Sequence, residues 1–356
     1  MHKQEIIFLI LCVLALSIIP SYSFEDQTIK DFNSIVQNKG QKIKKNIQKH
    51  PIKIAFATPL KQVSDYWRRS IDSFKGRMDE IGLDYVIYEF STKTDEKRKL
   101  TQCIQSALKI EPDYLVLTPN APDDKIVISR LLVNDKVKII IQNMTIPDDD
   151  YKENPPFMYV GFDHTIGAGL IAKEYIKHFK GKTNIKYAML YFIVDSQVSR
   201  LRGDFFNEVI ANQTDFKLMA EYYTEGNRGK AKNAALKIID AHPDISFIHA
   251  CSTDIAFGIL DALEERNLKD KILVNGWGGG AVELKSLLSG GLNFTIMRMN
   301  DDNGVAMAEA IRLDLESKLK LKPIIFSGEM VIVTQEILKD DIFRLQEKAF
   351  RYSGNH

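Results

Sequence analysis

The feature that most constrains the fold of this chain is a regular alternation of short apolar runs with stretches of helical periodicity. The first run of this pattern predicts strands at residues 52–57, 85–88, 114–117 and 138–141. Between them it predicts helices at residues 65–81 and 94–109 and near 126–133. Continuous apolar strands that alternate with helices indicate a parallel sheet covered on both faces.

The same pattern starts again after a proline-containing break at residues 146–156. The second run predicts strands at residues 158–160, 188–192, 216–221, 247–250 and 272–275. Its helices are predicted at residues 166–179, 203–212, 230–241 and 255–266. Two consecutive units of similar size therefore predict an α/β protein with two lobes, each a doubly wound parallel sheet.

The last part of the chain departs from this order. A strand at 295–297 is followed by a helix at 300–319, and residues 324–333 are mostly extended. A helix between two extended segments, so late in the chain, predicts that the chain crosses between the lobes more than once and forms a multi-strand hinge. We therefore predict one lobe from residues 24–145 plus 298–322 and the other from residues 146–297 plus 323–356.

The N-terminus has the three-part pattern of a secretory signal. Lys3 precedes an uncharged apolar run at residues 6–20, and the small residues Ser21 and Ser23 follow it. We expect cleavage after residue 23 and a periplasmic location; a transmembrane anchor is the alternative, but the run is short for a bilayer. Residues 24–50 are predicted to form a helical extension with one apolar stripe, ended by Pro51. The stripe comprises Ile29, Phe32, Val36, Ile43 and Ile47.

Composition excludes several classes of function. The chain has 48 basic and 47 acidic residues, and this balance gives no reason to expect nucleic acid or an anionic membrane surface as partner. No stretch after the signal is long and apolar enough to span a bilayer, so we expect no direct membrane insertion. After signal cleavage Cys103 and Cys251 remain, and the compartment permits one disulfide between them. Because they fall in different predicted lobes, where a link would obstruct hinge motion, we expect two small buried apolar residues instead. The sequence contains no G-x-S-x-G, Walker or H-E-x-x-H motif, and its seven histidines lack metal-ligand spacing. We expect neither an enzyme nor a metal or cofactor.

In open α/β sheets a ligand binds beyond the carboxyl ends of the strands, so the residues that follow each strand are the candidates. After the first strand, Gln62 and Trp67 are expected to face the crevice, and Ser64 can cap the next helix. The alternative for Trp67 is core packing. Asn143 follows the fourth strand, where ordinary turn chemistry is the alternative.

The second lobe offers a comparable set. One arginine of the loop at 198–204 is a candidate, with a solvated surface loop as the alternative; Thr253 and Asp254 follow a strand and are also candidate helix caps. Trp277 ends a strand before three glycines, and Arg298 ends a strand beside the expected hinge. This set suits a hydroxyl-rich, sugar-sized ligand, because it combines two tryptophans, arginines and several amide, hydroxyl and carboxylate groups.

Eight short motifs are distributed along the mature chain, namely QVSDYW (62–67), QNMTIP (142–147), YVGFDH (159–164), RGDFF (202–206), ACSTD (250–254), NGWGGG (275–280), MRMNDD (297–302) and AFRYS (349–353). In their combination, nearly the whole mature chain resembles the LuxP type of autoinducer-2-binding periplasmic protein. The signal, the lysine-rich extension and the loops depart from the pattern of the family.

The resemblance implies a type I periplasmic binding fold and a role in quorum sensing. It implies boronated autoinducer-2, a furanosyl borate diester, as ligand, with boron as part of that ligand, and a LuxQ-type membrane hybrid sensor kinase as partner. By motif match the pocket would consist of Gln62, Ser64, Trp67, Asn143, Arg202, Thr253, Asp254, Trp277 and Arg298.

A borate diester is an anion, and Arg202 and Arg298 are expected to hold it from opposite sides of the crevice. Two other functions are weighed against this one. A ribose-like sugar-binding protein of an ABC transporter needs a pocket for an uncharged ligand, and a secreted α/β enzyme needs a nucleophile–base pair that is not evident.

Overall fold

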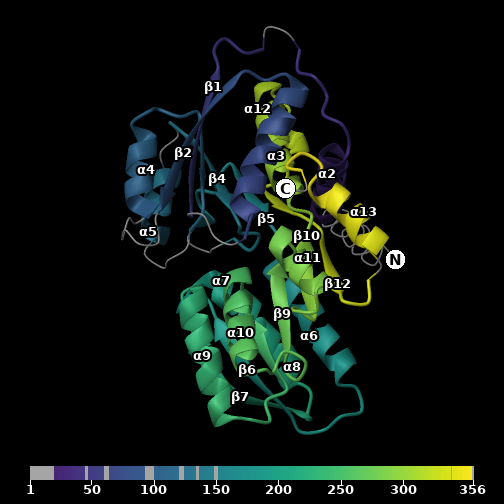
Figure 1. Ribbon diagram of the computed structural model, residues 1–356. Helices are drawn as coiled ribbons and strands as arrows, with labels where there is room; N and C mark the ends of the chain where they lie inside the picture. Colours follow the sequence, from purple (N-terminus) through teal and green to yellow (C-terminus); the bar gives the residue numbers. More distant parts are fainter. Residues whose placement is uncertain are drawn as a thin grey trace, which may run out of the picture.

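The computed structural model describes residues 20–44, 47–59, 64–92, 100–119, 124–133, 136–147, 151–337 and 339–354. The expected signal segment, apart from its last four residues, lies outside the described residues. The described chain forms two lobes, each built on a six-stranded sheet with helices around it (Figure 1). The sequence prediction of a two-lobed α/β fold is confirmed.

The first lobe contains the sheet with strand order β11-β5-β4-β3-β1-β2, and all its neighbouring strands are parallel. Its strands are β1 (Ile52–Pro59), β2 (Tyr85–Thr92), β3 (Tyr114–Leu117), β4 (Lys138–Gln142), β5 (Met158–Gly161) and β11 (Ile325–Ser327). Its helices are α2 (Pro20–Gln37), α3 (Tyr66–Ile81), α4 (Leu100–Leu108), α5 (Asp124–Leu132), α12 (Asp301–Leu315) and the 3₁₀ turn η3 (Leu319–Leu321).

The second lobe contains the sheet with strand order β12-β10-β9-β8-β6-β7, in which only β12 is antiparallel to its neighbour. Its strands are β6 (Ile185–Tyr191), β7 (Phe216–Tyr223), β8 (Phe247–Ala250), β9 (Leu273–Gly278), β10 (Phe294–Arg298) and β12 (Met330–Thr334). Its helices are α6 (His164–His178), α7 (Gln197–Ser199), the π-helical turn η2 (Arg200–Asp204), α8 (Phe205–Ala211), α9 (Arg228–Ala241), α10 (Thr253–Glu265) and α11 (Ala281–Leu288); α13 (Lys339–Ala349) follows β12.

The central strands are mostly apolar because both faces of each sheet are covered. In the first lobe, Phe56 and Val116 pack in the core on one face, while Ala57 and Leu117 pack in the core on the other. Successive residues of a strand point to opposite faces, so a strand between two cores has apolar residues at most positions. This is why the strands were recognisable in the sequence.

The boundary between the lobes differs from the prediction at two strands. Residues 158–160 were assigned to the second lobe, but β5 pairs with β4 in the first sheet. Residues 325–327 were also assigned to the second lobe, but β11 pairs with β5. The reason is packing, since Met158 and Phe326 are buried in the core of the first lobe.

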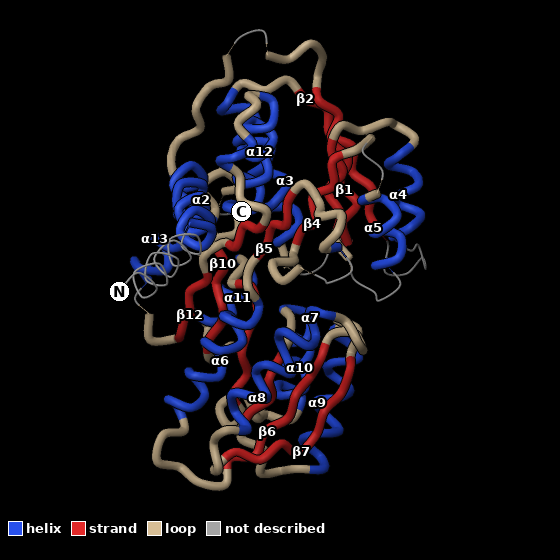
Figure 2. The backbone as a smooth tube through the Cα atoms, turned by 180° about the vertical axis from the view of Figure 1, so that it is seen from behind, coloured by secondary structure: helices blue, strands red, loops and turns tan. Residues whose placement is uncertain are grey.

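The chain crosses between the lobes after β5, after β10 and after β11, and these crossings lie side by side. Gly328 donates its backbone N–H to the Gly161 carbonyl at 2.8 Å, and Met299 donates to Glu329 at 3.0 Å. Figures 1 and 2 show β5 and β10 next to each other where the lobes meet. The expected multi-strand hinge is therefore present.

The N-terminal extension is only partly helical. Phe32 and Val36 on α2 are buried against the first lobe, as the apolar stripe predicts. The helix ends at Gln37, however, and Ile43 reaches the same core from non-helical chain, where its N–H donates to the Ile81 carbonyl at 2.9 Å. Asn38 and Gly40 favour a helix end here, which the prediction of a helix up to residue 50 missed.

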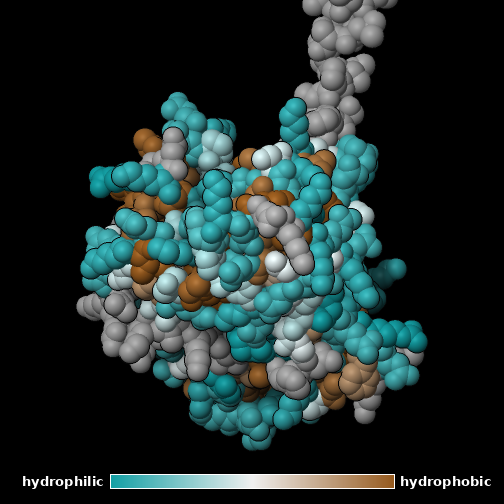
Figure 3. Space-filling model, turned by 90° about the horizontal axis from the view of Figure 1, so that it is seen from above, coloured by the Kyte–Doolittle hydropathy of each residue, from teal (hydrophilic) through white to brown (hydrophobic). Residues whose placement is uncertain are grey.

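Seen from the far end of the first lobe, the molecule is mostly hydrophilic, with hydrophobic residues in small patches (Figure 3). Cys103 and Cys251 are both buried, as expected, and no disulfide joins them to each other. No helix among the described residues has the length and the apolar character needed to span a membrane.

Candidate ligand-binding site

A cavity lies between the lobes, at the carboxyl ends of the strands of both sheets. Its volume is about 50 Å³. All the residues expected in the pocket line it except Gln62, which lies outside the described residues. The lining residues that the sequence predicted are Ser64, Trp67, Asn143, Arg202, Thr253, Asp254, Trp277 and Arg298.

Arg202 enters the cavity from a π-helical turn, η2, between α7 and α8. The turn is wider than an α-helix, and such turns recur at functional sites. Gly203 allows it, because a Cβ at this position would lie 2.1 Å from the Tyr191 ring. Arg202 donates from Nη1 to the Cys251 carbonyl at 3.1 Å, and its guanidinium carbon lies 4.7 Å from the Trp277 ring centroid.

Arg298 is the last residue of β10, at the point where the chain leaves the second lobe. Its guanidinium carbon lies 4.2 Å from the ring centroid of Tyr66, which belongs to the first lobe. Gly278 makes room for it, since a Cβ there would be 2.7 Å from Arg298 Nη2. The expectation that the two arginines arise from opposite lobes is wrong, because β10 is a strand of the second sheet.

The two guanidinium groups are buried without a negative partner. Arg202 is 7% exposed and Arg298 is 5% exposed. In the described part of the chain neither forms an ion pair with a carboxylate, and the Nε of each has no hydrogen-bond partner. Burial, together with the charge of Arg298, lowers the pKa of Arg202 to about 9; burial also lowers the pKa of Arg298.

His164 lies behind the arginines, at the start of α6. Its Nε2 is 3.5 Å from Arg202 Nη2, and its ring packs edge-on against Trp277 with centroids 6.1 Å apart. Burial and the two arginine charges hold the pKa of His164 well below its ordinary value. The imidazole is therefore neutral and adds no further positive charge at neutral pH.

The two tryptophans come from different lobes, Trp67 from α3 and Trp277 from β9. The Nε1 of each is buried and has no hydrogen-bond partner. Trp67 also packs against Tyr66, with ring centroids 4.6 Å apart. It therefore takes part in core packing, the alternative weighed for it, and also lines the cavity. The walls thus combine aromatic faces with N–H donors that have no acceptor.

The polar residues at the strand ends are held by local structure. Asn143 follows β4 with a left-handed backbone, φ 64°, and its side-chain oxygen is buried without a partner. Ser252, not Thr253 or Asp254, caps α10, since its hydroxyl accepts from the Ile255 N–H. Thr253 instead donates to the Trp277 carbonyl at 2.9 Å. The helix-cap alternative for Thr253 and Asp254 is wrong.

Four lining residues were not predicted, namely Tyr66, Phe192, Val198 and Ser252. All follow or end strands in the clusters that the strand-end rule had already selected. Tyr66 lies between two predicted residues, and Phe192 ends the predicted strand 188–192. The sequence located the clusters, but it could not tell which of their members point inward.

Comparison with known proteins was informative at two levels. Residues 54–318 match the model of the family described as periplasmic binding protein domain. The ribose import binding protein RbsB of Salmonella typhimurium is 28% identical over 151 residues, which are 42% of this chain and 50% of that protein. The RbsB of Escherichia coli matches with the same identity and coverage. The chain thus spans about half the length of the curated relatives it matches.

Among solved structures, an ABC transporter periplasmic solute-binding protein from Actinobacillus succinogenes with bound D-allose superposes with a TM-score of 0.69. It is 20% identical and covers 80% of this chain and 98% of its own. A carbohydrate transporter solute-binding protein from Agrobacterium radiobacter in complex with D-arabinose gives a TM-score of 0.71 at 17% identity, with 84% and 99% covered. At these identities the likeness concerns the fold.

Proposed function

Because the chain belongs to the periplasmic binding protein domain family, we propose that it is a receptor, not an enzyme, that closes its lobes on a small anionic ligand with a hydroxyl-rich ring. The observation that carries this proposal is the pair of buried arginines without a carboxylate partner. Burying an unpaired cation is costly. A ligand anion would offset that cost, because both guanidinium groups could donate charge-assisted hydrogen bonds to it.

The rest of the cavity suits the ring of such a ligand. Trp67 and Trp277 supply aromatic faces and two N–H donors without acceptors. Ser64, Asn143 and Thr253 supply hydroxyl and amide groups around them. A few polar groups in a largely aromatic wall are typical of pockets that orient a small ligand.

Among anions of this kind we favour the furanosyl borate diester of autoinducer-2. The support is the resemblance of the motifs at the strand ends together with the charge of the site. A tetrahedral borate diester carries one negative charge on a sugar-sized ring, so it meets both the arginines and the aromatic walls. Boron would belong to the ligand and not to the protein.

The location and the partner follow from the same resemblance. We place the receptor in the periplasm, with a LuxQ-type membrane sensor kinase as the protein that responds to lobe closure. A closed receptor presents a different surface from an open one, which is all that a membrane partner needs to distinguish the two.

The second candidate is a sugar-binding protein of an ABC transporter. The names of the relatives favour it over a signalling role, because the curated matches are ribose import binding proteins and the solved structures include sugar complexes. The unpaired arginines argue for a charged ligand, whereas ribose is neutral. The two candidates share the fold and differ in the charge of the ligand.

Titration calorimetry distinguishes them. The purified protein would be titrated with the autoinducer-2 precursor in rigorously boron-free buffer, with the precursor plus borate, and with ribose. We expect tight binding only when borate is present. Equal binding with and without borate would remove the borate diester from consideration, and tight ribose binding would establish the transporter alternative.

A further inference from the structure

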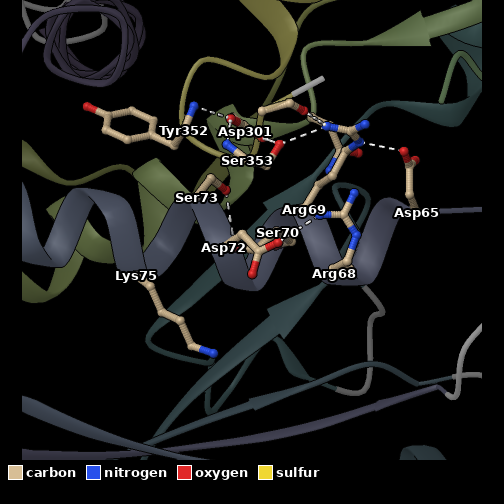
Figure 4. A network of polar contacts seen from close by, with 12 residues as sticks. Asp65, Arg68, Arg69, Ser70, Asp72, Ser73, Lys75, Asp301, Tyr352 and Ser353 are labelled. Atoms are coloured by element: carbon tan, nitrogen blue, oxygen red, sulfur yellow. Dashed lines mark hydrogen bonds and ion pairs between the residues drawn. The ribbon is translucent and has the colours of Figure 1, made fainter. Parts of the chain in front are cut away.

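Several motif residues that do not line the cavity meet in one polar cluster on the first lobe. The cluster joins α3, the start of α12 and a C-terminal segment, residues 350–354 (Figure 4). Its residues include members of three of the motifs that carry the family resemblance, QVSDYW, MRMNDD and AFRYS. Because these residues do not line the cavity, ligand binding does not explain their arrangement.

Arg69 lies at the centre of the cluster and is fully buried. Its Nε donates to Asp65 Oδ2 at 2.5 Å, and its Nη1 donates to Ser353 Oγ at 3.0 Å and to the Gly354 carbonyl. Its guanidinium carbon lies 3.6 Å from the ring centroid of Phe350. The C-terminal segment therefore holds the Arg69 side chain in place, and Arg69 in turn positions the carboxylate of Asp65.

Asp301, the first residue of α12, holds the C-terminal segment in turn. Its carboxylate accepts from the backbone N–H of Tyr352 at 2.7 Å and of Ser353 at 2.8 Å. The Ser353 hydroxyl also donates to it at 2.7 Å. Figure 4 shows these contacts as one chain that runs from Asp301 through Ser353 and Arg69 to Asp65.

Asp65 itself reaches the other lobe. Its Oδ2 accepts from the backbone N–H of Ala281, the first residue of α11, over 3.4 Å. The N-cap residue of α11 is Gly280, which has no side chain to supply a cap. A Cβ at Gly280 would lie 2.4 Å from Asp65 Oδ1, so the carboxylate occupies the place of the missing cap side chain.

We propose that Asp65 is an interlobe latch, a positioning residue that caps α11 from across the cleft when the lobes are closed. The carboxylate satisfies an N–H at the helix start and meets the positive end of the helix dipole. In an open molecule both interactions are lost, so the contact favours closure without touching the ligand. The latch rests on the proposed function only in assuming that the lobes open and close.

The latch is one of at least two polar contacts across the cleft. On the other side of the cavity, Gln197 on α7 donates to the Ile146 carbonyl at 3.1 Å. Loss of Asp65 should therefore weaken closure without abolishing it. From the usual effect of a helix cap, we expect the closed-to-open ratio to fall roughly twofold to tenfold.

The test measures the distance between lobes in the full chain by pulsed electron paramagnetic resonance. Spin labels are placed at Ile126→Cys on α5 and Lys237→Cys on α9, both exposed. The native thiols Cys103 and Cys251 are buried and do not compete for label. The distance distribution of the ligand-free protein is compared with that of Asp65→Ala.

Asp72→Ala is the matched control, because Asp72 pairs with Arg68 four residues away on the exposed face of the same helix. Asp65→Ala leaves Arg69 without its carboxylate and can reduce folding, so Gly280→Ala is the second variant. It leaves Arg69 intact, suits the backbone at φ −71°, and places a methyl group against Asp65 only in the closed form. Gly169→Ala, whose Cβ meets only ordinary contacts, is its control.

We expect both Asp65→Ala and Gly280→Ala to shift the ligand-free distribution toward longer distances, and neither control to do so. If the distribution of Gly280→Ala equals that of the wild type, the latch does not exist. Addition of the autoinducer-2 precursor with borate is a separate arm. If it moves no variant toward shorter distances, the proposed ligand is wrong, while the latch is still decided by the ligand-free samples.

Discussion

Arg202 and Arg298 place two positive charges close together where neither has a carboxylate. Burial and the neighbouring charge of Arg298 both lower the pKa of Arg202. Ligand-free stability and ligand affinity therefore oppose each other at these positions. The side chains that are proposed to bind an anion are therefore expected to destabilise the ligand-free protein.

Substitution of either arginine by methionine separates the two effects. We expect Arg202→Met and Arg298→Met each to weaken ligand binding by about 2–4 kcal/mol, measured by calorimetry. The melting temperature of the ligand-free protein should stay the same or rise, because a buried unpaired charge is removed. Arg68→Met, on the exposed face of α3, should change neither. Wild-type affinity in Arg298→Met would contradict the role given to the arginines.

Two buried histidines make the protein sensitive to acid. Burial lowers the pKa of His249 to about 3, and burial with the arginine charges holds that of His164 well below its ordinary value. In the unfolded chain both take up a proton near pH 6.5. The unfolded state thus binds more protons below this pH, so the free energy of unfolding should fall as the pH drops from about 6.5.

Urea unfolding at pH 7.5, 6.5 and 5.5 measures this loss. Each neutral histidine contributes at most roughly 1.4 kcal/mol per pH unit. We expect the pH dependence in this range to become shallower in His164→Gln and in His249→Gln, and to be unchanged in His50→Gln, which alters an exposed histidine. A slope that is the same in all three variants would assign the acid sensitivity to other groups.

At the scale of elements, the pocket depends on turns that only glycine allows. Gly203 lets η2 pack on Tyr191, and Gly278, with φ 136°, lets the Arg298 guanidinium lie against the end of β9. Glu283 on α11 holds this end, because its carboxylate accepts from the N–H groups of Trp277 and Gly279 at 2.9 Å and 2.8 Å. The glycines after Trp277 therefore make room for the Arg298 side chain, and they do not form a dinucleotide-binding loop.

Gly278→Ala tests this arrangement. The new methyl group would lie 2.7 Å from Arg298 Nη2, so we expect the arginine to shift and ligand affinity to fall at least about tenfold. Gly290→Ala is the control, since Gly290 also has a positive φ, 79°, but open space around its Cβ position. Both variants should lose stability, by about 1 kcal/mol, from backbone strain; only Gly278→Ala should lose affinity in calorimetry.

The sequence predicted where the strands lie better than it predicted which strands pair with each other. The positions of the central strands were evident because both faces of each sheet are covered there, which makes most of their residues apolar. Whether β5 joins one sheet or the other depends on pairing with β4, and β5 has no residue whose type encodes that choice. In the same way, the strand-end rule located the pocket clusters, but the cap of α10 by Ser252 depends on backbone angles that the residue types Ser, Thr and Asp all tolerate.

At the scale of the whole molecule, the two lobes contact each other on both sides of the cavity. Asp65 accepts from the N–H of Ala281 on α11, Gln197 donates to the Ile146 carbonyl, and a cavity of about 50 Å³ lies between them. These are the contacts that we expect of a closed form. We expect the small-angle scattering curve calculated from this structure to fit the ligand-bound protein better than the ligand-free protein, whose radius of gyration should be larger. Identical curves for the two samples would exclude a closure mechanism.

The fluorescence of the two tryptophans reports the same transition. Trp67 and Trp277 face the cavity from different lobes, so both change surroundings when the cleft opens. We expect saturating ligand to change the emission of the wild type, and Trp67→Phe to remove part of that change. An emission spectrum that is insensitive to ligand would count against the assignment of the pocket.

The repeated crossing of the chain between lobes also bears on when the protein can fold. The first sheet receives β11 and the second receives β12 only near the end of the chain, and residues 350–354 then close the cluster around Arg69. A chain still being synthesised can therefore complete neither lobe, although domains commonly fold one after another during synthesis. Both sheets and the cluster around Arg69 are thus completed only after residues 350–354 have been made, so the two lobes reach their final fold together and not one after the other.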